Sequence, residues 1–353
     1  MRFPTSCTSL HLVAEGAATP QAVGSVLVIN VSRIGDTLLA TPALRALAHA
    51  FPEAAITCLA HPRRAEVLEH LPFLARVGRI DKRSAPLLGR LPGQRYDLAF
   101  VYGFDRALVS YALRVARRVV AFRQGDAALD ARLQPAVAEP RALSRHAVSM
   151  RLALLEPLGI RPAGLRLAYR VTSEELAWAR ERLRALGSRR PCIGLQVASF
   201  PTKAYRDWPV ECFAELAARI RARWPETHFL IFGGSEERTR TTWLAGRLGA
   251  AATSFAGALS LRQSAALMSC THLYVGVDTG PTHIMGCFDI PLVVLYHCHS
   301  SSRLLGALEH PCFYPVDHPH PHPCAEETPM SAIGVDAVFA AVARALGEHP
   351  PAP

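Results

Sequence analysis

Residues 26–54 read VLVINVSRIGDTLLATPALRALAHAFPEA, an apolar strand joined to an apolar helix by a short polar loop. The apolar runs predict a strand over 26–30 and a helix over 38–50. Ligands of open α/β sheets bind outside the carboxyl ends of the strands, where this loop lies. Gly35 lets the backbone come close to a ligand, and Asp36 is a candidate general base toward a ligand hydroxyl. The alternative is that Asp36 only stabilises the first turn of its helix.

The same strand-then-helix pattern recurs along the chain. Further strands are predicted at residues 55–60, 98–102, 192–197, 228–232, 272–277 and 291–296. Further helices are predicted at residues 209–224, 239–248, 260–268 and 335–346. Two helix starts carry potential capping boxes, Thr172 with Glu175 and Ser260 with Gln263. Strands that alternate with helices form parallel sheets, so the predicted fold class is α/β with doubly wound domains.

The chain is long enough for two domains, because 353 residues exceed one typical core. Pro and Gly cluster within 156–173 and interrupt the pattern, so the domain junction is predicted at 160–172. The predicted division is a loosely ordered leader at 1–24, an amino-terminal domain at 25–165 and a carboxyl-terminal domain at 166–353.

Composition and charge narrow the class of protein. Half of the residues are hydrophobic, and no apolar run is long enough to span a membrane. Nine scattered cysteines without a CxxC pair predict reduced thiols in a cytosol and no disulfide scaffold. The net charge is +10, and residues 1–160 hold 20 Lys and Arg against 12 Asp and Glu. A basic first half favours an anionic partner: nucleic acid, a phospholipid surface or an acidic glycolipid.

Three loops in the second half also follow predicted strands. The first is YVGVDTGPTHIMG, in which Asp278, Thr279 and Gly280 form the turn into a helix. The amides and dipole of that turn favour a phosphate, and His283 is placed to reach an anion. The alternative is an ordinary capped helix with a core-facing histidine.

The other two loops add a cation and an acid. In LQVASFPTKAYRDWP, Ser199, Lys203 and Arg206 follow a predicted strand, so a cation of this loop is a candidate to contact the ligand. The alternative is a basic loop that is only solvated. In FLIFGGSEE, Glu236 follows a predicted strand, at a position from which an acid can bind ribose hydroxyls. The alternative is that its negative charge only stabilises the N-terminus of the next helix. Backbone amides that can bind phosphate, a cationic side chain and a carboxylate that can accept hydrogen bonds from ribose together favour a nucleoside diphosphate as ligand. With Asp36 as a possible base, this set favours a group-transfer reaction. The absence of a GxGxxG fingerprint counts against a nicotinamide-dependent oxidoreductase.

Several segments, in this order and spacing, resemble glycosyltransferase family nine, the bacterial lipopolysaccharide heptosyltransferases. They are VLVINVSRIGDTLLATPALRALAHAFPEA, HAVSMRLALLEPLG, ASFPTKAYRDWPVECFAELAARI, LIFGGSEE and VGVDTGPTHIMGCFDIPLVVLY. The resemblance covers residues 25–346 and implies a GT-B fold, in which two Rossmann-like domains face a central cleft. It also implies an inverting enzyme that transfers a sugar from ADP-heptose to the inner core of lipopolysaccharide, with no metal or other cofactor.

The resemblance gives single residues their roles. Asp36 would deprotonate the acceptor hydroxyl, Asp278 would contact the donor sugar, and Glu236 would bind ribose. The residues implied to bind the donor are Ser199, Lys203, Arg206, Glu236, Asp278, Thr279, Gly280 and His283.

Either of two cations is placed to neutralise the leaving phosphate. In the family the cation stands two residues before a Trp-Pro pair, which is the position of Arg206. Lys203 stands five residues before Trp208, as if residues were inserted. Lys203 is favoured, because a chain with two lysines among 39 basic residues uses lysine where a compact charge is wanted.

The implied acceptor is an anionic lipopolysaccharide-type glycolipid. Arg33, Arg63 and Arg64 are candidate contacts, with surface solubility as the alternative for the last two. The enzyme would be cytoplasmic, touch the cytoplasmic face of the inner membrane peripherally and bind no nucleic acid. The alternative function is a non-catalytic nucleotide-sugar-binding protein of the same fold.

The tail alternates metal-binding residue types with prolines. His318, His320, His322 and Cys324 are types that bind zinc, but the rigid alternation without a second ligand pair favours a plain loop.

Overall fold

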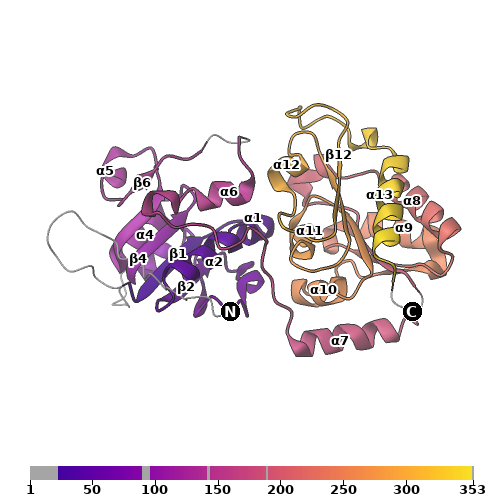
Figure 1. The fold of residues 1–353 in the computed structure, drawn as a ribbon, viewed down its shortest axis with the longest axis horizontal. Helices are drawn as coiled ribbons and strands as arrows, with labels where there is room; N and C mark the ends of the chain where they lie inside the picture. Colours follow the sequence, from indigo (N-terminus) through magenta and orange to yellow (C-terminus); the bar gives the residue numbers. More distant parts are fainter. Residues whose placement is uncertain (1–22, 90–95, 141–143, 188–189, 352–353) are drawn as a thin grey trace, which may run out of the picture. The chain divides into compact units, whose positions relative to one another are not determined.

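The computed structural model describes residues 23–89, 96–140, 144–187 and 190–351. The chain divides into two compact units, Met1–Leu165 and Arg166–Pro353, each with its own sheet and hydrophobic core (Figure 1). The predicted leader, residues 1–24, lies outside the described residues except for its last two positions.

The first unit is built on a six-stranded sheet of order β3-β2-β1-β4-β5-β6, in which all neighbouring strands are parallel. Its strands are β1 (Ser25–Asn30), β2 (Ala55–Ala60), β3 (Arg76–Arg79), β4 (Tyr96–Tyr102), β5 (Ala116–Phe122) and β6 (Ala136–Val137). Its helices are α1 (Ile34–Leu39), α2 (Thr41–Ala50), η1 (Ala65–Leu68), α3 (Ala85–Leu88), α4 (Arg106–Val115), α5 (Ala127–Asp130), α6 (Ala147–Leu152) and η2 (Glu156–Leu158).

The second unit is built on another six-stranded parallel sheet, of order β12-β11-β10-β7-β8-β9. Its strands are β7 (Cys192–Gln196), β8 (His228–Phe232), β9 (Ala252–Ser254), β10 (Leu273–Val277), β11 (Leu292–Tyr296) and β12 (Phe313–Asp317). Its helices are α7 (Ser173–Arg184), η3 (Pro201–Arg206), α8 (Val210–Arg223), η4 (Ser235–Glu237), α9 (Arg238–Leu248), η5 (Gly249–Ala251), α10 (Leu261–Met268), α11 (Gly280–Met285), α12 (Ser302–Leu305), η6 (Met330–Ala332) and α13 (Val335–Glu348).

The two sheets share one strand order. In the first, the chain builds outward from β1 through β2 and β3, then returns to the other side of β1 with β4. The second sheet does the same with β7 and β10. Such a reversal is the topological switch point of a doubly wound sheet. The predicted α/β class with two Rossmann-like domains is therefore confirmed.

The predicted elements are present with small shifts. All seven predicted strands occur, with ends displaced by at most two residues. Five further strands occur among the described residues: β3, β6 and β9 have four residues or fewer, β12 contains a proline, and the seven-residue β5 has two arginines directly after its first residue. The helix predicted over 38–50 is two helices that meet at Ala40, because Pro42 lacks an N–H and starts a new helix.

Helices α8, α9 and α13 lie together in the second unit and share one core with its sheet (Figure 1). Trp208, just before α8, is 1% exposed, and its indole N–H donates to the Ile333 carbonyl over 2.9 Å. Its ring packs edge-on against Phe213, with centroids 4.9 Å apart. This buried tryptophan fixes the end of the loop that carries both candidate cations.

Both predicted capping boxes are confirmed. The Thr172 side chain accepts from the Glu175 backbone N–H over 3.2 Å, and the Glu175 carboxylate accepts from the Thr172 N–H over 2.9 Å. Ser260 and Gln263 make the same pair of bonds at the start of α10. Each box satisfies donors that a helix start otherwise leaves unpaired.

Thr172→Ala should lower the free energy of unfolding of the second unit by about 1 kcal/mol, because it removes the N-cap acceptor of α7. In a thermal melt this corresponds to a shift of about 2–4 °C. Ser173→Ala is the control, since the Ser173 hydroxyl contacts exposed Glu174 outside the box. Equal shifts for the two variants would contradict a stabilising role of the box.

The cysteines differ from the sequence-based expectation. Cys298 and Cys324 form a disulfide across 26 residues, so the prediction of unpaired thiols is wrong for this pair. In the described part of the chain, the free cysteines are Cys58, Cys192, Cys212, Cys270, Cys287 and Cys312. Residue spacing did not reveal the pair because its members come together only through the fold.

Candidate active site

The carboxyl end of β1 leads to Asp36, the third residue of α1. Arg151 of α6 donates from Nη2 to Asp36 Oδ1 over 2.9 Å. The Asp36 side chain remains 42% exposed, so the ion pair orients the carboxylate while leaving it accessible. The Tyr102 hydroxyl, at the end of β4, donates to the Arg151 carbonyl over 3.2 Å. Asp36 therefore lies at the switch point of the first sheet, oriented by a residue 115 positions away.

The candidate acceptor arginines occupy different positions around this loop. Arg64 donates from Nη1 to the Ser32 carbonyl over 3.0 Å, which ties the segment after β2 to the loop before Asp36. Arg33 immediately precedes α1, and Arg33 and Arg63 are exposed. Arg64 thus supports the loop, whereas the other two present positive charge at the surface.

A buried acid follows β10 in the second unit. Asp278 is 2% exposed; Arg206 Nη1 lies 2.5 Å from its Oδ2, and His283 Nε2 lies 3.2 Å from its Oδ1. Burial on its own raises the pKa of Asp278, but the Arg206 charge and the His283 contact outweigh it and lower the pKa below its usual value. Asp278 is therefore an ionised carboxylate at neutral pH.

The contact between Arg206 and Asp278 joins two loops that are far apart in the sequence. Arg206 ends η3, which follows β7, and Asp278 follows β10. These strands flank the switch point of the second sheet. The structure thus brings together three of the predicted donor-binding residues, Arg206, Asp278 and His283, at the edge where open α/β sheets bind ligands.

The turn into α11 has the geometry expected for an anion site. Thr279 is the N-cap residue in extended conformation, and Gly280 is the first helical residue. The first N–H groups of a helix lack partners within it, which favours negative charge. The Thr282 hydroxyl donates to the Val277 carbonyl over 2.7 Å and so serves the turn itself.

Lys203 lies in the same loop as Arg206 but contacts a different acid. Its Nζ is 3.2 Å from Glu326 Oε1 and 3.4 Å from the Tyr205 hydroxyl. Arg206 Nε donates to the same Tyr205 hydroxyl over 3.2 Å. The hydrogen bond from Lys203 lowers the pKa of Glu326. Tyr205 thus contacts both cations and Glu326 contacts Lys203, and no local sequence pattern points to either residue.

Two other predicted donor residues lie nearby in the fold. Ser199 is buried, with its hydroxyl 2.7 Å from both the Lys203 carbonyl and Asp207 Oδ1, so it closes the cation loop. Glu236 lies exposed on η4 after β8, the strand next to β7. It therefore lies at the carboxyl end of the sheet, the edge at which open α/β sheets bind ligands.

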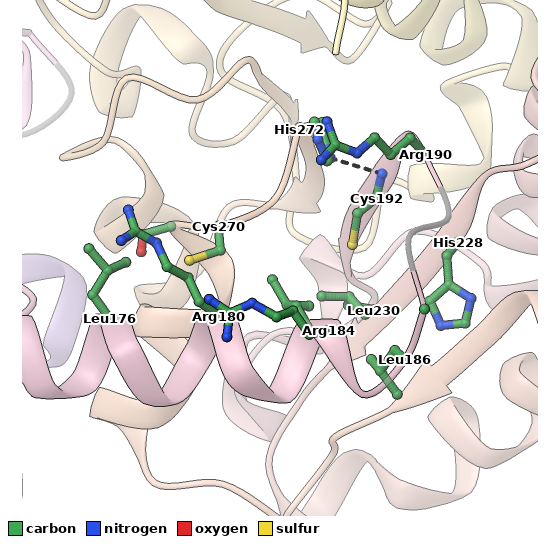
Figure 2. A pocket seen from close by; sticks show the side chains of 13 residues that line it. Leu176, Arg180, Arg184, Leu186, Arg190, Cys192, His228, Leu230, Cys270 and His272 are labelled. Atoms are coloured by element: carbon green, nitrogen blue, oxygen red, sulfur yellow. Dashed lines mark hydrogen bonds between the residues drawn. The ribbon is translucent and has the colours of Figure 1, made fainter. Parts of the chain in front are cut away.

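A cavity of about 420 Å³ lies at the opposite end of the second sheet (Figure 2). Its lining includes Cys192 and His228, which begin β7 and β8, and His272, which precedes β10. Arg180 and Arg184 of α7 also line it. The cavity is therefore distinct from the predicted donor-binding edge.

Comparisons with known proteins agree with the observed fold. The model of glycosyltransferase family 9 (heptosyltransferase) matches residues 88–315. Lipopolysaccharide heptosyltransferase 2 of Salmonella typhimurium is 26% identical over 298 residues, which cover 77% of this chain and 82% of that protein.

Two solved structures share the fold at 20% identity. A glycosyl transferase family 9 protein from Veillonella parvula has a TM-score of 0.78, with 93% of this chain and 99% of that chain covered. The E. coli ADP-heptose lipopolysaccharide heptosyltransferase II has a TM-score of 0.76, and the match covers 93% of this chain and 100% of that chain. Because the family model spans well over half of the sequence, this chain belongs to glycosyltransferase family 9, the heptosyltransferase family.

Proposed function

We propose that this glycosyltransferase transfers a heptose, or a related sugar, from an ADP-sugar to the inner core of a lipopolysaccharide acceptor. The family and the relatives named for ADP-heptose and lipopolysaccharide support this substrate class. The observation that carries the proposal is the Arg206–Asp278 contact, which unites the two switch-point loops of the second sheet around an ionised buried carboxylate.

In this proposal the second unit binds the donor. Asp278 accepts hydrogen bonds from sugar hydroxyls, and the Thr279–Gly280 turn gives amides to the pyrophosphate. Arg206 meets the leaving phosphate, since a guanidinium has five N–H donors and can serve Asp278 and a phosphate together. Lys203 adds charge from the same loop, and Glu236 binds ribose.

Asp36 acts as the general base. It removes the proton from an acceptor hydroxyl as that oxygen attacks the anomeric carbon, while the bond to the ADP oxygen breaks on the opposite face and inverts the configuration. The negative charge that develops on ADP is stabilised by Arg206 and the turn amides. The step requires Asp36 to lie within hydrogen-bonding reach of the acceptor hydroxyl in the ternary complex.

The proposed acceptor is a membrane-anchored, anionic glycolipid. Arg33, Arg63 and Arg64, with the excess of basic residues in 1–160, suit its phosphates and carboxylates. None of the described helices is long and apolar enough to cross a membrane. We propose peripheral contact with the cytoplasmic face of the inner membrane and a cytoplasmic location, with no role for nucleic acid.

The proposal is tested with ADP-heptose and lipopolysaccharide that lacks heptose. We expect ADP release together with an acceptor mass increase of one heptose, and neither with GDP- or UDP-sugars. Binding of ADP-heptose with no product in the presence of acceptor would favour the alternative, a non-catalytic nucleotide-sugar-binding protein.

Arg151→Ala should lower kcat about tenfold with little change in the KM for the donor, because Arg151 orients the Asp36 carboxylate. Arg151→Lys should restore part of the loss. Arg145→Ala is the matched control, since Arg145 pairs with exposed Glu156 over 3.2 Å. A loss in the control as large as in Arg151→Ala would rule out a specific positioning role.

A further inference from the structure

The segment after β12 folds back over the loop after β11 through histidine hydrogen bonds. This segment, residues 318–329, is termed the strap. Three ring–carbonyl pairs join the two segments: His297 Nε2 with Thr328 at 2.7 Å, His299 Nδ1 with Cys324 at 3.1 Å and His322 Nδ1 with Cys298 at 2.7 Å. A fourth, His318 Nε2 with Pro329 at 3.1 Å, joins the two ends of the strap itself. A carbonyl accepts, so each of these ring nitrogens carries the proton and each tautomer is fixed.

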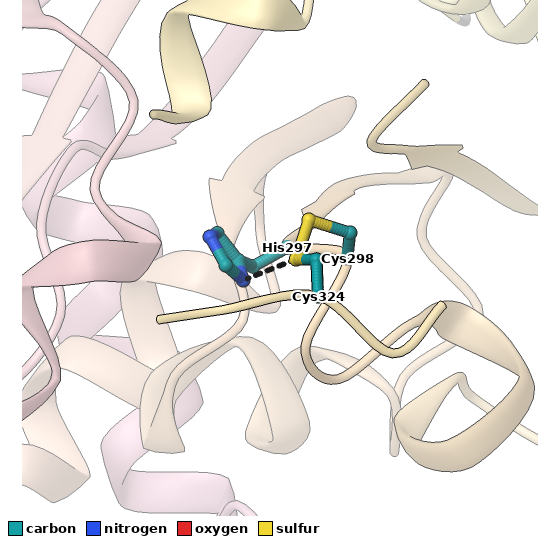
Figure 3. Close-up of side chains that lie close together, drawn as sticks. All are labelled: His297, Cys298 and Cys324. Carbon is teal, nitrogen blue, oxygen red and sulfur yellow. Dashed lines mark hydrogen bonds between the residues drawn. A yellow bond between two sulfur atoms is a disulfide. The ribbon is translucent and has the colours of Figure 1, made fainter. Parts of the chain in front are cut away.

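Two cysteines and one of these histidines form a compact group. Ligand atoms of His297, Cys298 and Cys324 all lie within 4.8 Å of one another (Figure 3). His297 and Cys298 are buried. Among the described residues this is the group suited to a metal ion, and of the predicted tail residues only Cys324 belongs to it.

The orientation of His297 is that of a metal ligand. Its Nε2–H donates to the Thr328 carbonyl, so Nδ1 holds the lone pair, 3.9 Å from Cys324 Sγ. Metal-binding histidines commonly donate their other ring N–H to a carbonyl in this way. Nδ1 now accepts from the His299 backbone N–H over 3.0 Å, a bond that a metal ion would replace.

We propose that the reduced protein binds one zinc ion through His297 Nδ1, Cys298 Sγ and Cys324 Sγ, with water in the fourth position. A dithiol or phosphine reductant supplies the two electrons that open the disulfide, and zinc then displaces the two thiol protons. Two thiolates and one imidazole suit zinc and not magnesium or calcium. This inference does not depend on the proposed function.

The ion would hold the strap beside the candidate donor loop. Cys324 is two residues before Glu326, which contacts Lys203. Tyr205 packs edge-on against His297, with ring centroids 5.0 Å apart. The bound ion would thus fix the surroundings of Lys203, and we expect it to take no part in the proposed reaction.

Cobalt titration of the reduced full-length protein tests the inference. After reduction with a phosphine and its removal, we expect one Co²⁺ per chain, with thiolate-to-cobalt absorption and the visible bands of a tetrahedral ion, displaced by Zn²⁺. Cys298→Ser, Cys324→Ser and His297→Ala should lose these bands. Cys270→Ser, which removes a free cysteine elsewhere, should keep them. Unchanged bands in the first three variants, or none in the reduced parent, would overturn the proposal.

Alkylation of the unmutated protein gives an answer even if a variant fails to fold. Zn²⁺ should protect Cys298 and Cys324 of the reduced chain from iodoacetamide, as read by peptide mass spectrometry. The labelling of half-buried Cys212 and Cys270 should not change. Equal labelling of Cys298 and Cys324 with and without Zn²⁺ would contradict the site.

Discussion

Asp36→Ala should lower kcat for sugar transfer by about 10²–10⁴-fold, because it removes the group that takes the acceptor proton. Donor binding should persist, since the candidate donor residues belong to the second unit. The measurement is ADP release under saturating ADP-heptose and acceptor, with ADP affinity measured separately by calorimetry. The expected signature is a loss in kcat with unchanged ADP affinity.

Asp36→Asn tests whether the side chain of residue 36 acts as a base, because asparagine keeps the size and shape of aspartate but is not basic. The amide oxygen can still accept a hydrogen bond from Arg151, but it cannot take a proton at neutral pH, so its activity should be as low as that of the alanine variant. Glu53→Gln, an exposed acid of the same unit, should remain fully active. Near-normal turnover in either Asp36 variant would refute the assigned base, whereas loss of ADP binding would indicate misfolding.

The fold was largely predictable because buried parallel strands leave a strong local pattern. Runs such as 228–232 and 55–60 are mostly apolar, and the structure has strands with those same ends. The edge strands carry weaker patterns. β3 is RVGR and β9 is ATS, and both depend on pairing with a neighbour more than on their own apolar content.

Candidate site residues could be proposed from the sequence only where they lie at or shortly after the end of a strand. Asp278 directly follows β10, and Asp36 lies in the first turn of the helix after β1, so strand ends located both. Arg151, Tyr205 and Glu326 could not be located in this way, because their contacts with the predicted residues arise from tertiary packing. Glu326 reaches Lys203 across 123 residues, and no local spacing encodes that distance. The Cys298–Cys324 pair was missed for the same reason.

Arg206→Ala should lower kcat by about 10²–10³-fold, because the leaving phosphate loses a fixed positive charge. It should also destabilise the second unit by about 3–5 kcal/mol, because Asp278 is 2% exposed and would lose its main partner. Steady-state kinetics and denaturant unfolding measure the two effects.

The stability loss in Arg206→Ala has a defined pH dependence. The pair with Arg206 lowers the pKa of Asp278 below its usual value of 3.8, so its contribution is present above that value and disappears as the pH falls through the folded-state pKa. The difference in unfolding free energy between parent and variant should therefore shrink in acid. A difference independent of pH would show that lost packing, and not the ion pair, is responsible.

Lys203→Ala decides which cation meets the phosphate. Lys203 is paired with solvent-exposed Glu326, so its removal should cost little stability and a smaller part of kcat than Arg206→Ala. Arg219→Ala, which breaks surface pairs with Glu215 and Asp336, is the control for general effects of removing an arginine. If Lys203→Ala loses more turnover than Arg206→Ala, then Lys203, the cation that the sequence favours because lysine is rare in this chain, stabilises the leaving group. Arg206 would then serve mainly to keep Asp278 ionised and in place.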